Sequence, residues 1–137
     1  MVLEFLTGAP PSTKTERAFA TVVFTDIVES TTSSARHGDD QWAHLLDEHD
    51  RLAWNICDTP AGSIVKSTGD GVLARFAMPS QAIDFARDLR SQLSHLGLPI
   101  RVGLHTGEIE IRAHQDLSGF AVNLAARVEQ AAADGTI

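Results

Sequence analysis

Two aspartates of this chain stand at the predicted ends of strands, where carboxylates can meet. Asp26 closes the apolar stretch AFATVVFTDIV (residues 18–28), and Asp70 lies at the tip of a predicted hairpin, GSIVKSTGDGVLARFA (residues 62–77). Two convergent carboxylates with no histidine or cysteine beside them suit Mg²⁺ or Mn²⁺ better than zinc. A helix cap at Asp26 and a turn residue at Asp70 explain the same pattern equally well, because both roles favour aspartate.

Lys66 is an unusual residue for its position, inside a short apolar strand of a chain that holds nine arginines and two lysines. A compact ammonium group can bind one acceptor atom, such as a ring nitrogen or a phosphate oxygen. A lysine on the solvent face of the strand is the simpler interpretation. The segment is not a P-loop, because GSIVKS lacks the glycine before the lysine and the spacing of that motif.

Asn123 and Arg127 are one turn apart on the last predicted helix and lie off its apolar stripe, so their side chains project together. A guanidinium group suits the charge that develops on a phosphoryl group during transfer. A solvated polar pair on a helix surface is the simpler alternative.

The overall composition favours a single intracellular α/β domain. The chain has 137 residues and a net charge of −7 from 11 basic and 18 acidic residues, which argues against a nucleic-acid polymer as partner. The 43% hydrophobic content is enough for a core, and one cysteine excludes an internal disulfide. The longest apolar run is far shorter than the ~20 residues that span a bilayer, and the N-terminus lacks signal-peptide features. A cytoplasmic location is therefore expected.

The elements that must position these residues follow from the hydrophobic pattern. Residues 1–16 have the composition of a tail or linker, and residues 17–137 form the expected domain, truncated at its C-terminal end because the chain stops where a further strand should begin. The pattern predicts strands over 18–26, 62–67, 72–77, 100–107 and 108–113, and helices near 30–37, 39–57, 79–96 and 117–133. This order predicts an α+β fold with a ferredoxin-like (split βαβ) sheet and helices packed on one face.

Four segments together resemble the successive signatures of class III nucleotidyl cyclase catalytic domains, of the bacterial adenylyl cyclase type. They are FTDIVEST (24–31), KSTGDGVLARF (66–76), IRVGLHTGE (100–108) and DLSGFAVNLAAR (116–127). The resemblance implies a metal site, a purine site and a catalytic pair. Their residues would be Asp26 and Asp70 with the Ile27 carbonyl for the metals, Lys66 and Asp116 for the purine, Asn123 for the ribose, and Arg127 for the transition state.

The activity implied is conversion of ATP to cyclic AMP and pyrophosphate in a head-to-tail homodimer. The resemblance implies two Mg²⁺ or Mn²⁺ ions in each shared site, which would lower the pKa of the ribose 3′-hydroxyl and offset phosphate charge. Adenine presents an acceptor at N1 and donor hydrogens at its amino group, which complement Lys66 and Asp116. Guanine would oppose both groups, and guanylyl cyclases usually have glutamate at the position of Lys66.

Two positions depart from the family pattern. Glu108 stands where some members have a phosphate-binding arginine, and the chain ends before the position of a C-terminal phosphate-binding lysine. The alternatives to an adenylyl cyclase are a guanylyl cyclase and a catalytically silent module that binds nucleotide or a partner. A diguanylate cyclase is disfavoured, since no GGDEF-like segment occurs at the hairpin.

Overall fold

The computed structural model describes residues 16–57, 62–111, 117–118, 120–132 and 135–137. The predicted tail therefore lies almost wholly outside the described residues. The elements in chain order are β1 (Glu16–Ile27), α1 (Ser30–His37), α2 (Asp39–Ile56), β2 (Gly62–Ser67), β3 (Val72–Phe76), α3 (Pro79–His95), β4 (Ile100–Ile111), β5 (Leu117–Ser118) and α4 (Phe120–Ala131).

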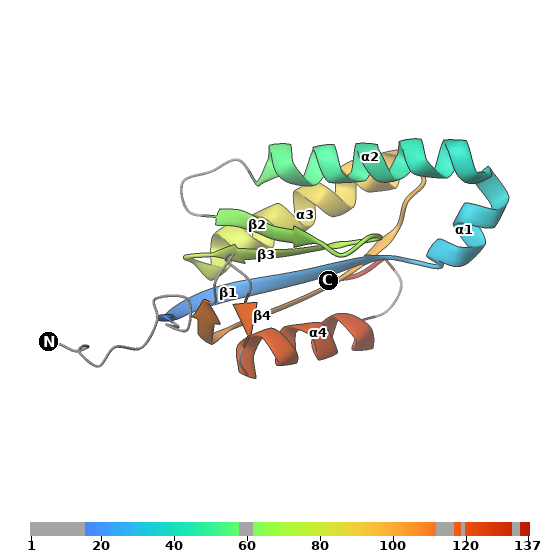
Figure 1. Ribbon diagram of the computed structural model, residues 1–137. Coiled ribbons are helices and arrows are strands. Elements are labelled where there is room, and N and C mark those ends of the chain that lie inside the picture. The colour runs from blue at the N-terminus through green and yellow to red at the C-terminus, as the bar shows by residue number, and fades with distance from the viewer. Residues whose placement is uncertain (1–15, 58–61, 112–116, 119, 133–134) are drawn as a thin grey trace, which may run out of the picture.

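The sheet is antiparallel, with strands in the order β2-β3-β1-β4-β5. β1 is central and pairs with β3 on one side and with β4 on the other (Figure 1). This arrangement confirms the predicted split-βαβ topology, in which the first strand and the hairpin are neighbours. It brings the C-terminal end of β1 next to the β2–β3 turn.

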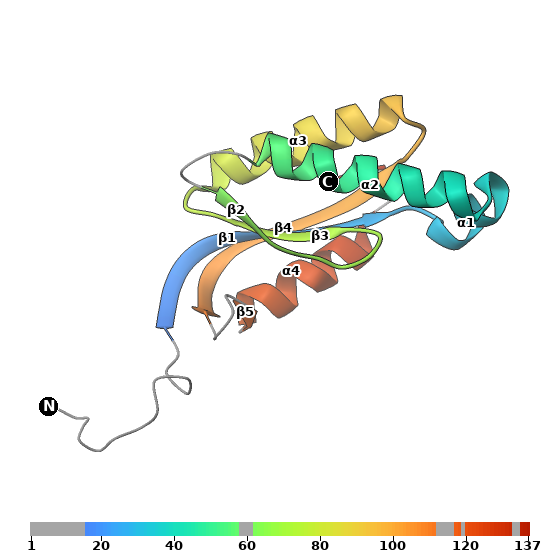
Figure 2. The same cartoon turned by 45° about the horizontal axis from the view of Figure 1, so that its top comes forward.

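The two faces of the sheet pack against different helices. On one face, Val23 and Ile27 of β1 join a core formed with α2 and α3, and on the other, Ala20 and Val22 pack with α4. Figures 1 and 2 show α4 across the sheet from α2 and α3. The predicted α+β architecture is confirmed, but the helices cover both faces of the sheet rather than one. The reason lies in β1, whose adjacent residues Val22 and Val23 are both fully buried and need cover on both sides.

The strand β4 also differs from the expectation. The two strands predicted over 100–107 and 108–113 form one continuous strand, because each residue from Ile100 to Ile111 has a partner in β1. Gly107 therefore does not break the strand. The next strand is the two-residue β5, which occupies the predicted start of the last helix, and α4 begins at Phe120.

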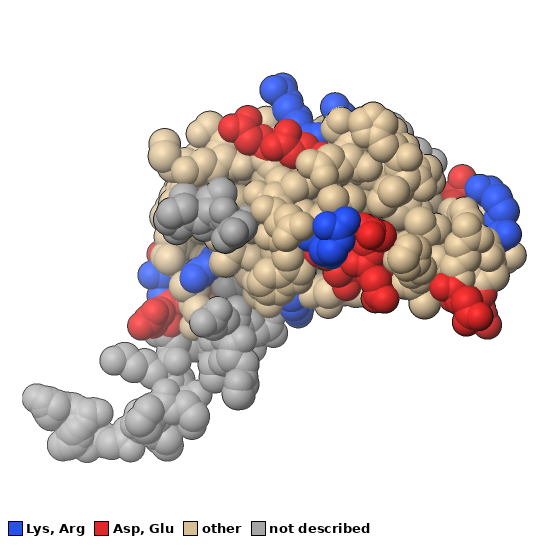
Figure 3. Space-filling view, turned by 90° about the horizontal axis from the view of Figure 1, so that it is seen from above, with Lys and Arg blue, Asp and Glu red and all other residues tan. Residues whose placement is uncertain are grey.

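Charged side chains are spread over the face that α2 and α3 cover. Figure 3 shows acidic and basic groups there in small separate clusters. Among the described residues, no helix has the length and apolar character needed to cross a bilayer.

Candidate active site

Asp26 lies near the end of β1 and faces α4. In the β1–β4 register it stands directly opposite Arg101, whose Nη2 donates a hydrogen bond to Asp26 Oδ2 at 3.1 Å. The helix after β1 begins at Ser30, with Glu29 as its N-cap residue and no side-chain capping bond. Asp26 therefore does not cap that helix, which removes the simpler of its two interpretations.

Asp70 lies in the tight turn between β2 and β3 and is fixed to the end of β1. Its carbonyl oxygen accepts a hydrogen bond from the Ile27 amide at 2.8 Å, and its Oδ2 accepts one from Ser30 Oγ at 2.8 Å. The turn is closed by a bond from the Thr68 amide to the Gly71 carbonyl at 2.9 Å. Both the backbone and the side chain of Asp70 are thus positioned by the segment that follows Asp26.

Gly71 allows the hairpin to come this close. A β-carbon at Gly71 would lie 1.8 Å from the carbonyl oxygen of Thr25, so no larger residue fits without moving a backbone. The next amide, that of Val72, donates to Thr25 Oγ1 at 3.0 Å in a buried position. The glycine in the Asp-Gly pair therefore serves the contact between strands as well as the turn.

The two carboxyl groups influence each other. Burial raises the pKa of Asp26 above its usual value, and the neighbouring Asp70 carboxyl raises it further, while Arg101 acts in the opposite direction. The pKa of Glu129 on α4 is also raised, first by burial and then by the charge of Asp26. Arg101 alone does not offset the negative charges of Asp26, Asp70 and Glu129, and a bound cation would supply the missing positive charge.

The donor set fits a hard divalent cation. Mg²⁺ is usually held by one or two carboxylates, with water and substrate phosphates completing the shell, and Asp26 and Asp70 provide such a pair. In the part of the chain that the structure describes, no group of three histidine, cysteine or acidic residues is arranged to hold a metal.

Lys66 lies on β2, four residues before Asp70, and is exposed. It stands opposite Leu73, just after the register of β2 and β3 shifts between Ile64 and Lys66. Such a shift re-aims side chains, and it occurs here beside the turn that carries Asp70. Asp116, the predicted partner of Lys66 in reading the base, lies outside the described residues.

Asn123 and Arg127 are both exposed on α4. Among the described residues neither side chain has a hydrogen-bond or ion-pair partner. Glu129, on the same helix, is buried, and two positions along a helix correspond to roughly 200° of rotation, so Arg127 points away from the sheet. The structure thus brings Asp26 and Asp70 together and leaves Asn123 and Arg127 on an outward surface.

Sequence reasoning missed two charged residues at this site, Arg101 and Glu129. Their Nε and Oε2 atoms are 3.7 Å apart beneath α4. A signal for each was present in the sequence. Arg101 is flanked by the apolar residues Ile100 and Val102 in a strand, and Glu129 is placed four residues after Ala125 on the apolar stripe of its helix.

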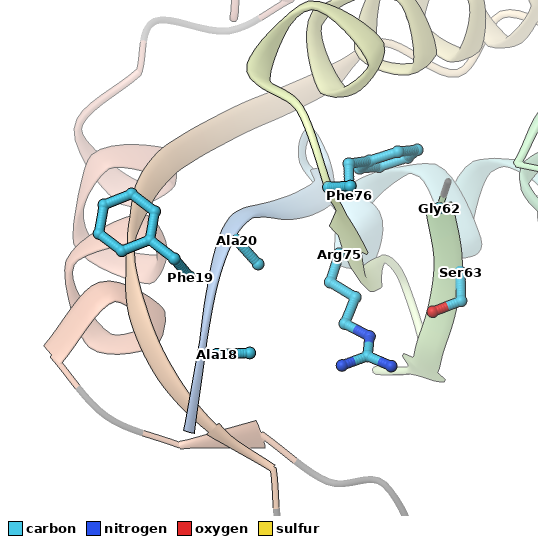
Figure 4. Close-up of a pocket in the computed structure, with 8 residues that line it drawn as sticks. Ala18, Phe19, Ala20, Gly62, Ser63, Arg75 and Phe76 are labelled. Atoms are coloured by element: carbon cyan, nitrogen blue, oxygen red, sulfur yellow. The ribbon is translucent and has the colours of Figure 1, made fainter. Parts of the chain in front are cut away.

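A hollow of about 360 Å³ lies elsewhere, at the edge of the sheet where β3 ends and β1 continues. Figure 4 shows Arg75 on one side of it and Phe19 turned away from it. Its lining comes from β1, β2 and the end of β3: Ala18, Phe19, Ala20, Gly62, Ser63, Arg75, Phe76 and Ala77. None of the predicted site residues contributes to it, so we place the candidate site at the other end of β1.

Comparisons with known proteins show which chains this one resembles. A protein of Rhizobium meliloti (strain 1021) named "Putative adenylate cyclase 3" is 36% identical over 84 residues, which are 56% of this chain and 14% of the relative. The chain therefore matches only a small part of that protein's length.

Two solved structures have the same fold. The adenylyl cyclase CyaB from P. aeruginosa superimposes with a TM-score of 0.73 at 28% identity, over 89% of this chain and 76% of that chain. The monomeric guanylyl cyclase domain of a fusion protein from the aquatic fungus Blastocladiella emersonii gives a TM-score of 0.76 at 26% identity, over 90% of this chain and 81% of that chain. A family model also matches residues 13–137. The chain therefore belongs to the adenylate and guanylate cyclase catalytic domain family.

Proposed function

We propose that this chain is an adenylyl cyclase, which converts ATP to cyclic AMP and pyrophosphate in a homodimer with shared active sites. The observation that carries the proposal is the pairing of Asp26 with Asp70, where burial and mutual repulsion raise the pKa of Asp26. A pair of carboxylates in this state is suited to a divalent cation, and the family to which the chain belongs acts on nucleotides.

Asp26 and Asp70, with the Ile27 carbonyl, would hold two Mg²⁺ or Mn²⁺ ions. When bound, these ions would lower the pKa of the ribose 3′-hydroxyl and offset the negative charge of the phosphates. The task of the chain itself is to keep both carboxylates in place. The Ser30 hydroxyl and the Ile27 amide do so at Asp70, and Arg101 does so at Asp26.

Lys66 and Asp116 would select adenine. The Lys66 ammonium donates to N1 of adenine, and the Asp116 carboxylate accepts from the 6-amino group. Guanine in the same position presents an N–H to the lysine and a carbonyl to the aspartate, which leaves both groups unpaired. The exposure of Lys66 beside the hairpin turn leaves its side chain accessible to a base.

Asn123 and Arg127 would act on the nucleotide bound by a second copy of the chain. Asn123 orients the ribose, and Arg127 stabilises the charge that develops on the α-phosphate. Their exposure on the outward face of α4 supports this assignment, because a second chain can reach them there. Each dimer would then contain two sites, with Asp26 and Asp70 from one chain and the other four side chains from its partner.

The test is an assay of the purified chain with ATP or GTP, each in Mg²⁺ and in Mn²⁺, with the cyclic product identified by chromatography. We expect cyclic AMP from ATP and much less cyclic GMP from GTP. Production of cyclic GMP alone would indicate a guanylyl cyclase. No product from either nucleotide, with nucleotide binding retained, would indicate a silent binding module.

A further inference from the structure

Arg101 stands between two carboxylates that belong to different elements. Its Nη2 donates to Asp26 Oδ2 at 3.1 Å, and its Nε lies 3.7 Å from Glu129 Oε2. The side chains of Arg101 and Asp26 are 28% and 29% exposed, so both are only partly shielded from bulk water. The guanidinium group therefore connects the end of β1 with α4.

Glu129 is held firmly in its place. Its exposed fraction is 7%, and it lies on the face of α4 that packs on the sheet. The backbones of β4 and α4 approach closely at this point, because a β-carbon on Gly103 would lie 2.1 Å from the Glu129 amide nitrogen. A shift of Glu129 relative to β4 would therefore require the helix to separate from the strand.

The Arg101–Glu129 contact is an ion pair without a hydrogen bond. Both Arg101 Nε and Glu129 Oε2 are buried and have no hydrogen-bond partner among the described residues. Nη2 of the guanidinium donates to Asp26, whereas Nε and the buried Glu129 Oε2 form only the ion pair at 3.7 Å, although a buried carboxylate oxygen is costly to leave without a hydrogen bond. The arrangement favours the orientation of Asp26 over the best geometry at Glu129.

We propose that Arg101 and Glu129 are positioning residues for metal binding at Asp26, an inference that rests on the proposed function. Arg101 fixes Asp26 through Oδ2 and leaves the other carboxylate oxygen for a cation. Glu129 balances the charge of Arg101, which would otherwise repel the cation. Asp26, Asp70, Glu129 and Arg101 together carry a net charge of −2 when the carboxylates are ionised, so the cluster attracts divalent cations.

The first test measures Mn²⁺ binding to the full chain by the EPR signal of free Mn²⁺, with 3′-deoxy-ATP present so that cyclisation is impossible. We expect Glu129→Gln to weaken Mn²⁺ binding by roughly 10-fold, the lower end of the usual effect of residues that orient metal ligands. The matched control is Glu110→Gln on the distant end of β4, which should bind as the wild type does.

A second variant keeps the proposal testable if Glu129→Gln does not fold. Arg101→Lys keeps the positive charge beside Asp26 but cannot span both carboxylates, and we expect a similar loss of Mn²⁺ affinity. Wild-type affinity in folded Glu129→Gln or Arg101→Lys protein would overturn the proposal. A wild-type chain that neither binds Mn²⁺ nor makes cyclic AMP would overturn the proposed function together with it.

The second test uses mixed dimers with one intact site, made from an Asp26→Ala chain and an Arg127→Ala chain. The intact site takes its Asp26 from the Arg127→Ala chain. Glu129→Gln should raise the Mn²⁺ concentration for half-maximal activity when it is placed in that chain, and not when it is placed in the Asp26→Ala chain.

Comparing Glu129→Gln in the two chains distinguishes a positioning role at Asp26 from a general effect on the stability of the fold. Equal effects from both placements would mean that Glu129 only stabilises the fold, and the proposal would be wrong. If the parent mixture is inactive while Glu129→Gln still weakens Mn²⁺ binding, the shared-site function fails and the positioning role stands.

Discussion

The end of β1 and the outward face of α4 carry the two halves of the proposed site, and they are built differently. Asp26 and Asp70 are partly buried and fixed by hydrogen bonds to neighbouring segments, whereas Asn123 and Arg127 are exposed and have no partner among the described residues. Both carboxylates proposed for the metals thus come from one chain. The two residues proposed for catalysis lie on a surface, as expected if a second chain supplies the nucleotide that they act on.

The largest effect should come from the metal half. Asp26→Ala and Asp70→Ala are each expected to abolish turnover while circular dichroism shows an intact fold, because each removes a ligand that no neighbour can replace. The control is Asp84→Ala on the exposed side of α3. Near-normal activity with unchanged metal dependence in either variant would remove the metal role of these residues.

Mixing inactive chains tests whether the two halves belong to different subunits. Asp26→Ala protein mixed with Arg127→Ala protein should recover about a quarter of wild-type activity, since half the dimers are mixed and each holds one intact site. The measurement is cyclic AMP formation after subunit exchange has been verified independently. If all the residues act within one chain, the mixture stays inactive.

Base selection should be altered by a smaller factor. Lys66→Glu combined with Asp116→Cys is expected to lower ATP turnover by at least ~10-fold, because each lost polar contact costs roughly 1–3 kcal/mol. Competition assays with ATP and GTP measure the preference. An unchanged preference for ATP would mean that other residues read the adenine.

The contact between the hairpin and β1 can be disturbed without touching a carboxylate. Gly71→Ala should destabilise the domain by about 1–3 kcal/mol and reduce activity, since its β-carbon would collide with the Thr25 carbonyl. Gly97→Ala gives the effect of backbone strain alone, because that glycine has a φ of 75°, which alanine adopts only with strain, and open space around it. Thermal unfolding of both variants gives the comparison, and wild-type stability in Gly71→Ala would mean that the close contact is unimportant.

The smallest effect concerns pH. The raised pKa of Asp26 means that the folded chain holds its proton to higher pH than the unfolded chain does, so this group disfavours folding at pH 7 and the penalty fades as pH falls through its folded pKa. Without metal, Asp26→Asn should therefore raise Tm by a few degrees at pH 7, and less below pH 4. A lower Tm at pH 7 would show that the bond to Arg101 outweighs the repulsion by Asp70.

The sequence was sufficient for most of the topology. The apolar run before Asp26, the Asp-Gly pair at residues 70 and 71, and the helical spacing after Pro79 each define an element by local rules. The placement of α4 was not predictable in this way. The continuous apolar run of β1 is typical of a strand buried on both faces, but it does not show which helix covers each face, because that depends on contacts between residues far apart in the chain.

The dependence on contacts between distant parts of the chain also explains which site residues could be predicted from the sequence. Asp26 and Asp70 were predicted because each lies at the end of a strand. Arg101 was missed because, with helices expected on one face only, a charged residue inside a strand is assigned to solvent, and Glu129 was missed because a charged residue on a helix is assigned to solvent in the same way. Their pairing depends on the register of β1 with β4 and on the close contact at Gly103, which involve residues far apart in the chain.

The backbone contacts between β1 and the hairpin turn also decide how the site can be lost. The Ile27 amide is bonded to Asp70, and the Val72 amide to Thr25, where the hairpin turn meets the end of the central strand β1. Local opening of a surface loop leaves these bonds in place, so the spacing of the carboxylates is lost only when the central strands separate. The catalytic geometry therefore shares the cooperativity of the whole domain, and agents that loosen its periphery leave the carboxylate pair intact until global unfolding.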